Sequence, residues 1–450
     1  MKRIIGLILA LLMLAALAAC TAKNDGTETK EPAKTEGETK TEAPAAQEDK
    51  KDEAPAEPVE VVLWHTYTDH HQAALEQIIA DFNSSQSEYK VVAQSQPYSE
   101  WDAKLLQSVS TGVGPDMCPM FASDAVGYMN EGYLYDMTSI INETIPDFKE
   151  QLAAGLYAEI TQWGNSSIYM MPVTMTSEVL YYNKTWLDEL GISVPTTWTE
   201  VEAAAKAIHE KYGVAGFGTD SITDTFQGWL MQSGSQYIDV ASKQIALNEE
   251  TALKYLNWFA DGVKEDYFRL VGEDYYFSNP FGSEAVGMYV GSAAGVDYAA
   301  GAIPAEGEAG HFEMGVAPLP QEGPVKYISS WGSTYVCLSK DEAHAKGVAA
   351  FIKYFTSKEV LPGWAKSFGA VPARKESMES EDFQAYAAEN KAVKALVEEF
   401  DYINYLPAVA GAATVRTEID KMVQSVALGL SDAKTAYDAF VAASNAALND

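Results

Sequence analysis

Residue types that commonly carry out chemistry are sparse and poorly clustered in this sequence. His65, His70 and His71 fall within seven residues of one another, which raises the question of a metal site. Adjacent histidines point in different directions on a helix, whereas metal-binding pairs usually lie four residues apart or on neighbouring loops. We therefore expect no metal here and interpret these histidines as solvated residues at the start of a helix, with His65 as a candidate ligand contact.

Motifs of the common enzyme classes are missing. The sequence has no Gly-x-Ser-x-Gly elbow, phosphate-binding loop, dinucleotide glycine fingerprint or His-Glu-x-x-His pair. The 64 acidic residues allow a carboxylate pair of the glycoside hydrolase kind to be drawn, but that mechanism needs a fixed separation across a cleft, which sequence spacing does not show. We expect a binding protein without a cofactor, and a secreted glycoside hydrolase is the alternative.

Aromatic residues give a more useful signal than the titratable ones. Five of them fall where the alternation of strands and helices breaks into loops: Trp64, Tyr98, Phe226, Trp229 and Trp331. In open α/β sheets, ligands lie beyond the carboxyl ends of strands, where such loops converge. Aromatic rings beside hydroxyl and carboxylate groups suit the apolar faces and hydroxyl edge of a sugar. Packing in a core is the competing interpretation for each ring, and it is weakest for Trp331.

The charge balance and the cysteine count exclude several partners. Over 450 residues, acidic residues outnumber basic ones 64 to 31, and the formal net charge is -33. This charge repels nucleic acid and anionic membrane surfaces. Arginine, the usual bidentate clamp for phosphate, is scarce, so an anionic ligand is disfavoured. Three cysteines without a Cys-x-x-Cys pair provide neither a disulfide scaffold nor a zinc site.

The N-terminal segment predicts export and anchoring. Two basic residues precede an apolar run over 4–19, which is short for a membrane span and typical of a signal peptide. The run ends in Leu-Ala-Ala-Cys20, which resembles a bacterial lipobox, so residues 1–19 would be removed and Cys20 would be diacylated. Two acyl chains anchor a protein stably. Residues 20–58 would then be the lipidated cysteine and a solvated linker, because the segment after Cys20 has no aromatic or large aliphatic residue.

The remaining chain alternates strands with helices and is assigned to the α/β class. A strand over 59–64, a helix that carries Leu75, Ile78, Ile79 and Phe82 on one face, and a strand over 89–93 predict parallel pairing. Further strands are expected over 116–121 and 178–183.

Helix ends are predicted from capping residues. Asp69 with Gln72, and Thr197 with Glu200, have the capping-box spacing, and Ser99 can cap the helix that follows it. Gly112 and Gly191 are expected to end helices.

Several short segments resemble the extracellular solute-binding lipoproteins of ABC importers, in the group with maltose-binding and glycerol-3-phosphate-binding proteins. The segments, which cover nearly the whole chain from residue 59, are Leu63-Trp64-His65, Thr111-Gly112 through Pro115-Asp116, Leu180-Tyr181-Tyr182-Asn183-Lys184, Pro195 with Thr197-Trp198, Phe226-Gln227-Gly228-Trp229, Trp331-Gly332, Gly369, Pro372 and Arg416. Their order and spacing carry the resemblance, which implies a two-lobed periplasmic-binding-protein fold of class II with a ligand cleft between the lobes.

The resemblance also implies boundaries. Lobe one would take residues 59–173 and 314–365, and lobe two would take residues 174–313 and 366–450, with one crossing near Pro172 to Ser177.

Site residues are carried over one by one. Tyr98, Thr176, Phe226, Ser292, Gly332 and Arg416 match ligand-contacting positions of the family, although Arg416 has a structural ion pair as its competing interpretation. The acidic ligand position after the third strand falls on Ala122 or Ser123. The complete set of candidate ligand contacts is Trp64, His65, Tyr98, Ser123, Asp124, Thr176, Phe226, Trp229, Ser292, Trp331, Gly332 and Arg416.

Two departures from the glycerol-3-phosphate binders decide between ligands. The acidic position becomes Ala122 or Ser123, and a tyrosine of the family becomes Ala370. We therefore expect a monomeric, lipid-anchored, extracytoplasmic receptor that delivers a neutral mono- or oligosaccharide to the transmembrane subunits of an ABC permease. A binder of a polyol phosphate such as glycerol 3-phosphate is the alternative ligand assignment, and a surface adhesin without a ligand is a third hypothesis.

Overall fold

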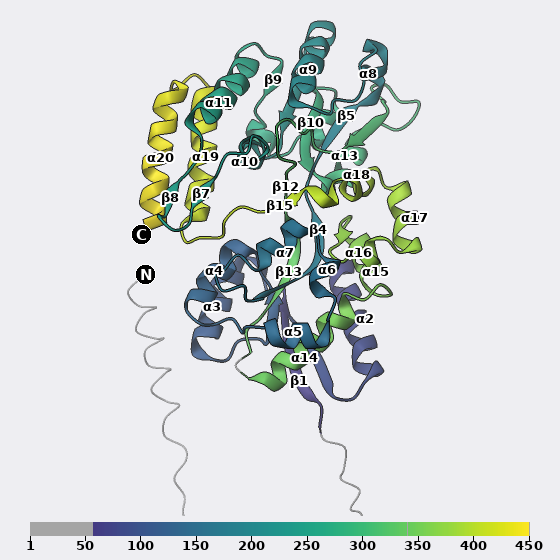
Figure 1. The fold of residues 1–450 in the computed structure, drawn as a ribbon. Helices are drawn as coiled ribbons and strands as arrows, with labels where there is room; N and C mark the ends of the chain where they lie inside the picture. Colours follow the sequence, from purple (N-terminus) through teal and green to yellow (C-terminus); the bar gives the residue numbers. More distant parts are fainter. Residues whose placement is uncertain (1–56, 340, 450) are drawn as a thin grey trace, which may run out of the picture. The chain divides into compact units, whose positions relative to one another are not determined.

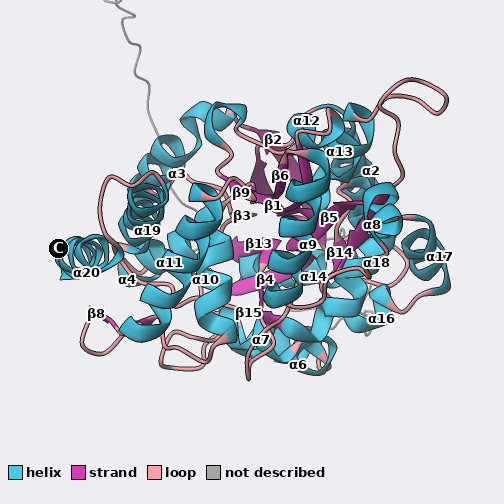
Figure 2. Ribbon diagram, turned by 90° about the horizontal axis from the view of Figure 1, so that it is seen from above, coloured by secondary structure: helices cyan, strands magenta, loops and turns pink. Residues whose placement is uncertain are grey.

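The computed structural model describes residues 57–339 and 341–449. The predicted signal peptide, the lipidated Cys20 and nearly all of the predicted linker lie outside these residues. The described chain forms two large mixed β-sheets covered by helices, as the α/β assignment requires, and two short two-stranded sheets (Figure 1). Viewed from above, the strands lie in the middle of the molecule with helices around them (Figure 2). No helix in the described part combines the length and the apolar character that a membrane crossing needs.

The first sheet has six strands in the order β14-β4-β13-β3-β1-β2. Its strands are β1 (Val59–His65), β2 (Tyr89–Ser95), β3 (Met117–Pro119), β4 (Met170–Thr176), β13 (Trp331–Cys337) and β14 (Val371–Pro372). β1 pairs in parallel with β2 and β3, as the strand-helix-strand order predicts. β13 returns from far along the chain and lies antiparallel between β3 and β4. We call this sheet and its covering helices lobe one.

The helices between these strands begin and end at residues that local chemistry explains only in part. They are α2 (Asp69–Ser85), η1 (Tyr98–Glu100), α3 (Trp101–Thr111), α4 (Ala122–Asn130), α5 (Thr138–Thr144), α6 (Phe148–Gln151), α7 (Ala154–Ile160), α14 (Glu342–Phe355) and α15 (Leu361–Ser367). Of the predicted apolar face of α2, Leu75, Ile79 and Phe82 are buried and Ile78 is partly buried. Gly112 ends α3 with a φ of 77°, as predicted for a left-handed cap.

Two predicted caps in this lobe are wrong. Asp69 is the first residue of α2 rather than its cap, and the flanking Thr68 makes no side-chain cap bond. Residues 98–100 form η1, so Ser99 does not cap α3. In both cases the helix begins one residue away from the position that the predicted cap implies, which removes the geometry that a cap needs.

The second sheet has five strands in the order β11-β5-β10-β6-β9. They are β5 (Glu178–Asn183), β6 (Ala215–Thr219), β9 (Phe268–Arg269), β10 (Val286–Ser292) and β11 (Met314–Ala317). The helices that follow them are α8 (Lys184–Leu190), α9 (Trp198–Tyr212), α10 (Ile222–Gln232), α11 (Glu249–Lys264), η2 (Gly272–Asp274), α12 (Ser278–Gly282), η3 (Ala293–Gly295) and α13 (Val296–Ala302). We call this sheet, its helices and the C-terminal pair α19 (Ala412–Ala427) and α20 (Ala433–Asn449) lobe two.

Helix ends in lobe two follow the sequence closely. Thr197 and Glu200 form the predicted capping box at the start of α9. Gly191 ends α8 with a φ of 68°. The smaller elements are β7 (Ile238–Asp239), β8 (Gln244–Ile245), β12 (Ile328–Ser329), α16 (Lys375–Met378), α17 (Glu381–Glu389), α18 (Lys391–Glu399), η4 (Phe400–Tyr402) and β15 (Ile403–Asn404).

The chain passes between the two sheets at short connections. Ser177 alone separates β4 of the first sheet from β5 of the second. On the return path, Ser330 alone separates β13 of the first sheet from β12, which pairs with β15 in a separate two-stranded sheet. β11 pairs with β5, and β14 pairs with β4. We therefore place residues 314–317 in lobe two and residues 371–372 in lobe one, whereas the sequence-based boundaries assign them the other way round.

Candidate ligand-binding cavity

A cavity of about 570 Å³ lies where the strands of the first sheet end. Thr66 follows β1, Met120 follows β3, and Thr176 is the last residue of β4. Ligand sites of α/β sheets form at this edge because the connecting loops converge there. The lining residues are Thr66, Tyr67, Tyr98, Trp101, Asp102, Leu105, Pro119, Met120, Phe121, Asp124, Tyr128, Thr174, Thr176, Ala294, Trp331, Gly332, Ser333, Thr334, Phe368 and Ala370.

Seven of the lining residues are aromatic: Tyr67, Tyr98, Trp101, Phe121, Tyr128, Trp331 and Phe368. Tyr98 and Phe121 are 84% and 61% exposed, which is unusual for large apolar side chains. Tyr67 is fixed more firmly, because its hydroxyl lies 3.1 Å from the Ser333 Oγ and its ring packs edge-on against Phe368. The cavity therefore combines an aromatic side chain that is fixed by its contacts with others that are largely exposed to solvent.

Hydroxyl groups provide most of the polar lining. Thr66, Thr174, Thr176, Ser333 and Thr334 all contribute to it. The Thr334 hydroxyl donates to the Met120 carbonyl at 2.6 Å and is therefore occupied. The Thr176 Oγ1 atom is buried and has no hydrogen-bond partner in the described chain. A buried polar atom without a partner is costly, so Thr176 is available to a ligand.

Two carboxylates, Asp102 and Asp124, line the cavity, and none of the lining residues is Lys, Arg or His. Burial and the charge of Asp102 raise the pKa of Asp124 above its usual value. The cavity is thus aromatic, rich in hydroxyls and acidic.

Five of the predicted contacts lie in this cavity: Tyr98, Asp124, Thr176, Trp331 and Gly332. They come from four separate stretches of lobe one, namely η1, α4, the end of β4 and the start of β13, which provides both Trp331 and Gly332. Gly332 is required for the close approach of β13 to β4, because a Cβ at this position would lie 2.1 Å from the Thr174 carbonyl oxygen.

Three predicted contacts of lobe one do not line the cavity. The buried Trp64 donates from Nε1 to Gln94 at 2.8 Å. His65 is also buried, and burial lowers its pKa. Its Nδ1 accepts a hydrogen bond from the backbone N–H of Tyr67 at 3.2 Å, so His65 supports a lining residue instead of touching a ligand. Ser123 is exposed on α4, outside the lining.

The two predicted aromatic contacts on α10 belong to the core of lobe two. Phe226 and Trp229 are both fully buried. Trp229 packs edge-on against Trp198 and Trp258, with ring centroids 5.6 and 5.0 Å away, and stacks on Tyr255. Neither ring presents a face to a ligand in this structure.

Ser292 and Ala294 approach the cavity from lobe two. The Ser292 Oγ accepts from the Ala294 backbone N–H, and the Ser292 carbonyl accepts from the Tyr181 hydroxyl at 2.7 Å. Ala294 lines the cavity, whereas Ser292 does not. Ser292 therefore positions the segment that reaches the cavity.

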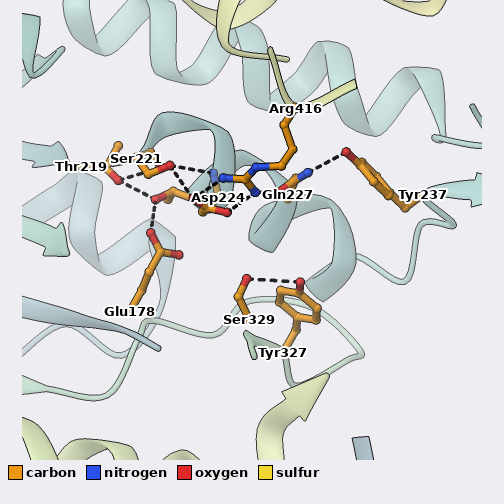
Figure 3. Close-up of polar contacts among 10 residues, drawn as sticks. Glu178, Thr219, Ser221, Asp224, Gln227, Tyr237, Tyr327, Ser329 and Arg416 are labelled. Carbon is orange, nitrogen blue, oxygen red and sulfur yellow. Dashed lines mark hydrogen bonds and ion pairs between the residues drawn. The ribbon is translucent and has the colours of Figure 1, made fainter. Parts of the chain in front are cut away.

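Arg416 on α19 forms an ion pair with Asp224 on α10 (Figure 3). Nη1 and Nη2 each donate to one carboxylate oxygen, the second at 2.9 Å, and Nη1 also donates to Gln227 at 3.1 Å. Gln227 in turn donates to the Tyr237 hydroxyl at 2.6 Å. Arg416 thus has the structural role that was its competing interpretation, and it does not line the cavity.

Glu178, directly after the crossing at Ser177, joins the same polar network. It is buried and accepts from the Thr225 hydroxyl at 3.1 Å (Figure 3). Burial and the nearby charge of Asp224 raise its pKa well above the usual value for a glutamate. The network holds β5, α10 and α19 together beside the crossing.

Sequence reasoning missed Tyr67, Trp101, Asp102, Phe121, Tyr128 and Phe368. Trp101 and Asp102 begin α3, and Phe121 precedes α4. These positions follow the carboxyl ends of parallel strands, so the same topological rule that selected Tyr98 could have selected them. Phe368 follows α15, and no local signal places it here.

Glu159, on α7 beside Ser330, gives a prediction about the pH dependence of folding stability. Burial raises its pKa to about 7, and the hydrogen bond from Ser330 lowers it only in part. Between pH 4.5 and 7 the unfolded chain loses this proton while the folded protein keeps it, so the folded state loses stability as pH rises and levels off above pH 7. Glu159→Gln removes this effect. We expect the variant to gain about 2 kcal/mol over the wild type at pH 8 and almost nothing at pH 4.

Urea unfolding from pH 4 to pH 8 measures this difference. The matched control is Glu150→Gln, at an exposed position of α6. A Glu159→Gln variant that is equally or less stable than the wild type at pH 8 would contradict the prediction.

The chain is similar in sequence to known bacterial solute-binding proteins. The family profile described as "Bacterial extracellular solute-binding protein" matches residues 77–395. The sn-glycerol-3-phosphate-binding periplasmic protein UgpB of Rhizobium meliloti (strain 1021) is 25% identical over 417 residues, which cover 86% of this chain and 94% of UgpB.

Two solved structures have similar folds. The cyclic alpha-maltosyl-1,6-maltose binding protein from Arthrobacter globiformis superposes with a TM-score of 0.75 at 22% identity, covering 87% of this chain and 99% of that protein. The sugar-binding protein MalE from Xanthomonas citri superposes with a TM-score of 0.77 at 17% identity, covering 87% and 98%. The predicted two-lobed fold is confirmed by these similarities.

Proposed function

Because this chain belongs to the bacterial extracellular solute-binding protein family, and is therefore a non-enzymatic solute receptor of an ABC importer, we propose that it captures a sugar. The sugar, a mono- or oligosaccharide, would bind in the cavity at the edge of the first sheet and be delivered to the permease. The observation that carries this proposal is the lining of the cavity, in which seven aromatic rings stand beside free hydroxyl and carboxylate oxygens. Rings stack on the apolar faces of a sugar, and the oxygens accept from its hydroxyls.

The contacts that the cavity offers can supply the binding free energy of a typical solute receptor. A micromolar dissociation constant corresponds to about 8 kcal/mol. Hydrogen bonds to charged groups contribute about 1.5 to 3 kcal/mol each, and Asp102 and Asp124 provide two such acceptors. One or two stacked rings supply the remainder, after the cost of ordering the ligand.

A polyol phosphate fits the cavity less well, although some relatives are named for glycerol 3-phosphate. A phosphate needs cationic or N–H donors, and no lining residue is basic. Arg416 is held by Asp224. Ala370 lines the cavity at the position where the resemblance implies a tyrosine in phosphate binders.

Closure of the lobes would complete the site. Nearly all lining residues belong to lobe one, and Ala294 is the lobe-two residue among them. Rotation about the connections at Ser177 and Ser330 would bring lobe two over the exposed rings of Tyr98 and Phe121. A ligand favours the closed state to the extent that it binds that state more tightly.

A lipid anchor at Cys20 is part of the proposal. The lipobox and the resemblance support it, and a diacylated cysteine would hold the receptor at the membrane near its permease. Metabolic labelling with a radioactive fatty acid tests this step. We expect label in the wild type and none in Cys20→Ala, and an unlabelled wild type would contradict the anchor.

A thermal-shift screen tests the proposed function. The purified protein is melted with glucose, maltose, cellobiose, longer oligosaccharides and glycerol 3-phosphate, because a ligand of the folded state raises the melting temperature. We expect at least one saccharide to raise it and glycerol 3-phosphate to leave it unchanged. A shift with glycerol 3-phosphate alone, or new reducing ends after incubation with an oligosaccharide, would contradict the proposal.

A further inference from the structure

The cavity contains two carboxylates and no counter-ion. Asp102 lies in the first turn of α3 and Asp124 in the first turn of α4, and both line the cavity. Both residues are exposed, and among the described residues neither side chain has an ion-pair or hydrogen-bond partner. Each carboxylate lies near the N-terminal end of a helix, where the helix dipole favours a negative charge.

Three basic side chains of the described chain have partners other than these carboxylates. Lys104, on α3 itself, lies over the Trp64 ring with its Nζ 5.6 Å from the ring centroid. Arg416 pairs with Asp224. His71 lies 2.9 Å from the Ser367 carbonyl through its Nε2 and stacks on Phe368. No side chain of the described protein therefore neutralises the two acidic groups.

From this arrangement we infer that the sugar carries a positive charge: the ligand is an amino sugar, or an oligosaccharide that contains one with a free amino group. This inference rests on the proposed function and narrows the class of sugar. A protonated amine between Asp102 and Asp124 would provide the counter-ion that the protein lacks.

The free-energy cost of burying the two carboxylates when the lobes close favours a cationic sugar over a neutral one. When lobe two covers the cavity, the two carboxylates lose water, and like charges in a dry site repel each other. A neutral sugar offers hydroxyl donors but leaves the net charge in place. An ammonium group both donates hydrogen bonds and cancels charge, so a cationic ligand gains more from closure than a neutral one.

The aromatic neighbours fit the same ligand. Trp101 adjoins Asp102 in the sequence, and Tyr128 lies one helical turn after Asp124; both rings line the cavity. The face of an aromatic ring attracts a cation as well as the apolar face of a sugar. Each carboxylate thus has an aromatic partner on its own helix.

Titration calorimetry with matched sugars tests the inference. Glucosamine and its β-1,4-linked dimer are compared with their N-acetylated forms and with glucose and cellobiose, at pH 6.5 and low salt. Opposite charges attract near a protein surface, so we expect the free amines to bind about tenfold more tightly than either neutral series, a difference of about 1.4 kcal/mol. Added salt should reduce this preference.

Two variants test whether the carboxylates cause the preference for the amino sugar. Asp102→Asn and Asp124→Asn should each reduce the preference for the amine several-fold, whereas Asp261→Asn, at an exposed position of α11, should leave it unchanged. The salt dependence of the wild type provides a second readout that does not depend on the folding of any variant.

Each remaining outcome overturns one specific claim. Neutral sugars that bind as tightly as their amino analogues would overturn the inference and leave the proposed function intact. An amine preference that survives both variants and high salt would overturn the role of Asp102 and Asp124. If none of these saccharides binds and other sugars also fail in the thermal-shift screen, the proposed function itself is wrong.

Discussion

Trp331→Ala is expected to weaken sugar binding about 70-fold. Trp331 is half-buried at the start of β13, beside Thr176 of β4, and its ring lines the cavity. A sugar face stacked on this indole removes roughly 100 Å² of apolar surface from water, which at about 25 cal/mol per Å² is about 2.5 kcal/mol. That free energy corresponds to the stated loss of affinity. Titration calorimetry with the tightest saccharide from the screen measures it.

The control for this variant is an exposed ring away from the cavity. Tyr276 is 66% exposed and does not line the cavity, so Tyr276→Ala should bind with wild-type affinity. The melting temperature of Trp331→Ala without ligand shows whether the fold is kept. An affinity within threefold of the wild type would remove Trp331 from the proposed site.

Gly332→Ala is expected to lower the free energy of unfolding by about 3 kcal/mol or more. Its backbone dihedral angles are ordinary, so the cost comes from space alone. The added Cβ would lie 2.1 Å from the Thr174 carbonyl oxygen and 3.3 Å from the Met175 Cα, both on the neighbouring strand. Backbone atoms of β4 would have to move, and overpacking of this kind is among the few causes of such large losses. Urea denaturation measures the change.

Gly363→Ala is the matched control. Gly363 lies in α15, and a Cβ there would meet no atom within 4 Å. Alanine is the better helix former, so this variant should be slightly more stable than the wild type, by about 0.5 to 1 kcal/mol. If Gly332→Ala costs less than 1 kcal/mol, the close approach of β13 to β4 is not as the structure has it.

Local patterns in the sequence predicted most of the individual elements. The buried face of α2, the parallel pairing of β1 with β2 and the capping box at Thr197 all follow from residues within one or two turns. Glycines 112 and 191 end their helices because a left-handed residue is required there. Such features depend on short-range sterics and hydrogen bonds, which the sequence states directly.

Long-range pairing could not be predicted in the same way. β13 inserts between β3 and β4, although more than 150 residues separate it from either strand along the chain. β11 joins the second sheet through β5. Nothing in the composition of these strands specifies their neighbours, since each is a short apolar run that fits several positions in a sheet.

The same limit separates the predicted contacts that line the cavity from those that do not. Trp229 and Trp331 are the same residue type beside glycines, yet one is enclosed by α11 and α9 and the other lines the cavity. Which ring is enclosed depends on helices that pack from elsewhere in the chain. For Arg416, the partner Asp224 lies 192 residues away, so the ion pair was visible only in the folded protein.

Titration of the intact protein with saccharides is the most direct test of the central claim, which is that this receptor binds a sugar at the carboxyl edge of its first sheet. The account predicts a saccharide with a micromolar or lower Kd, no new reducing ends during the titration, and the loss of affinity in Trp331→Ala. The absence of heat from every saccharide at millimolar concentration, or binding that Trp331→Ala leaves unchanged, would contradict it.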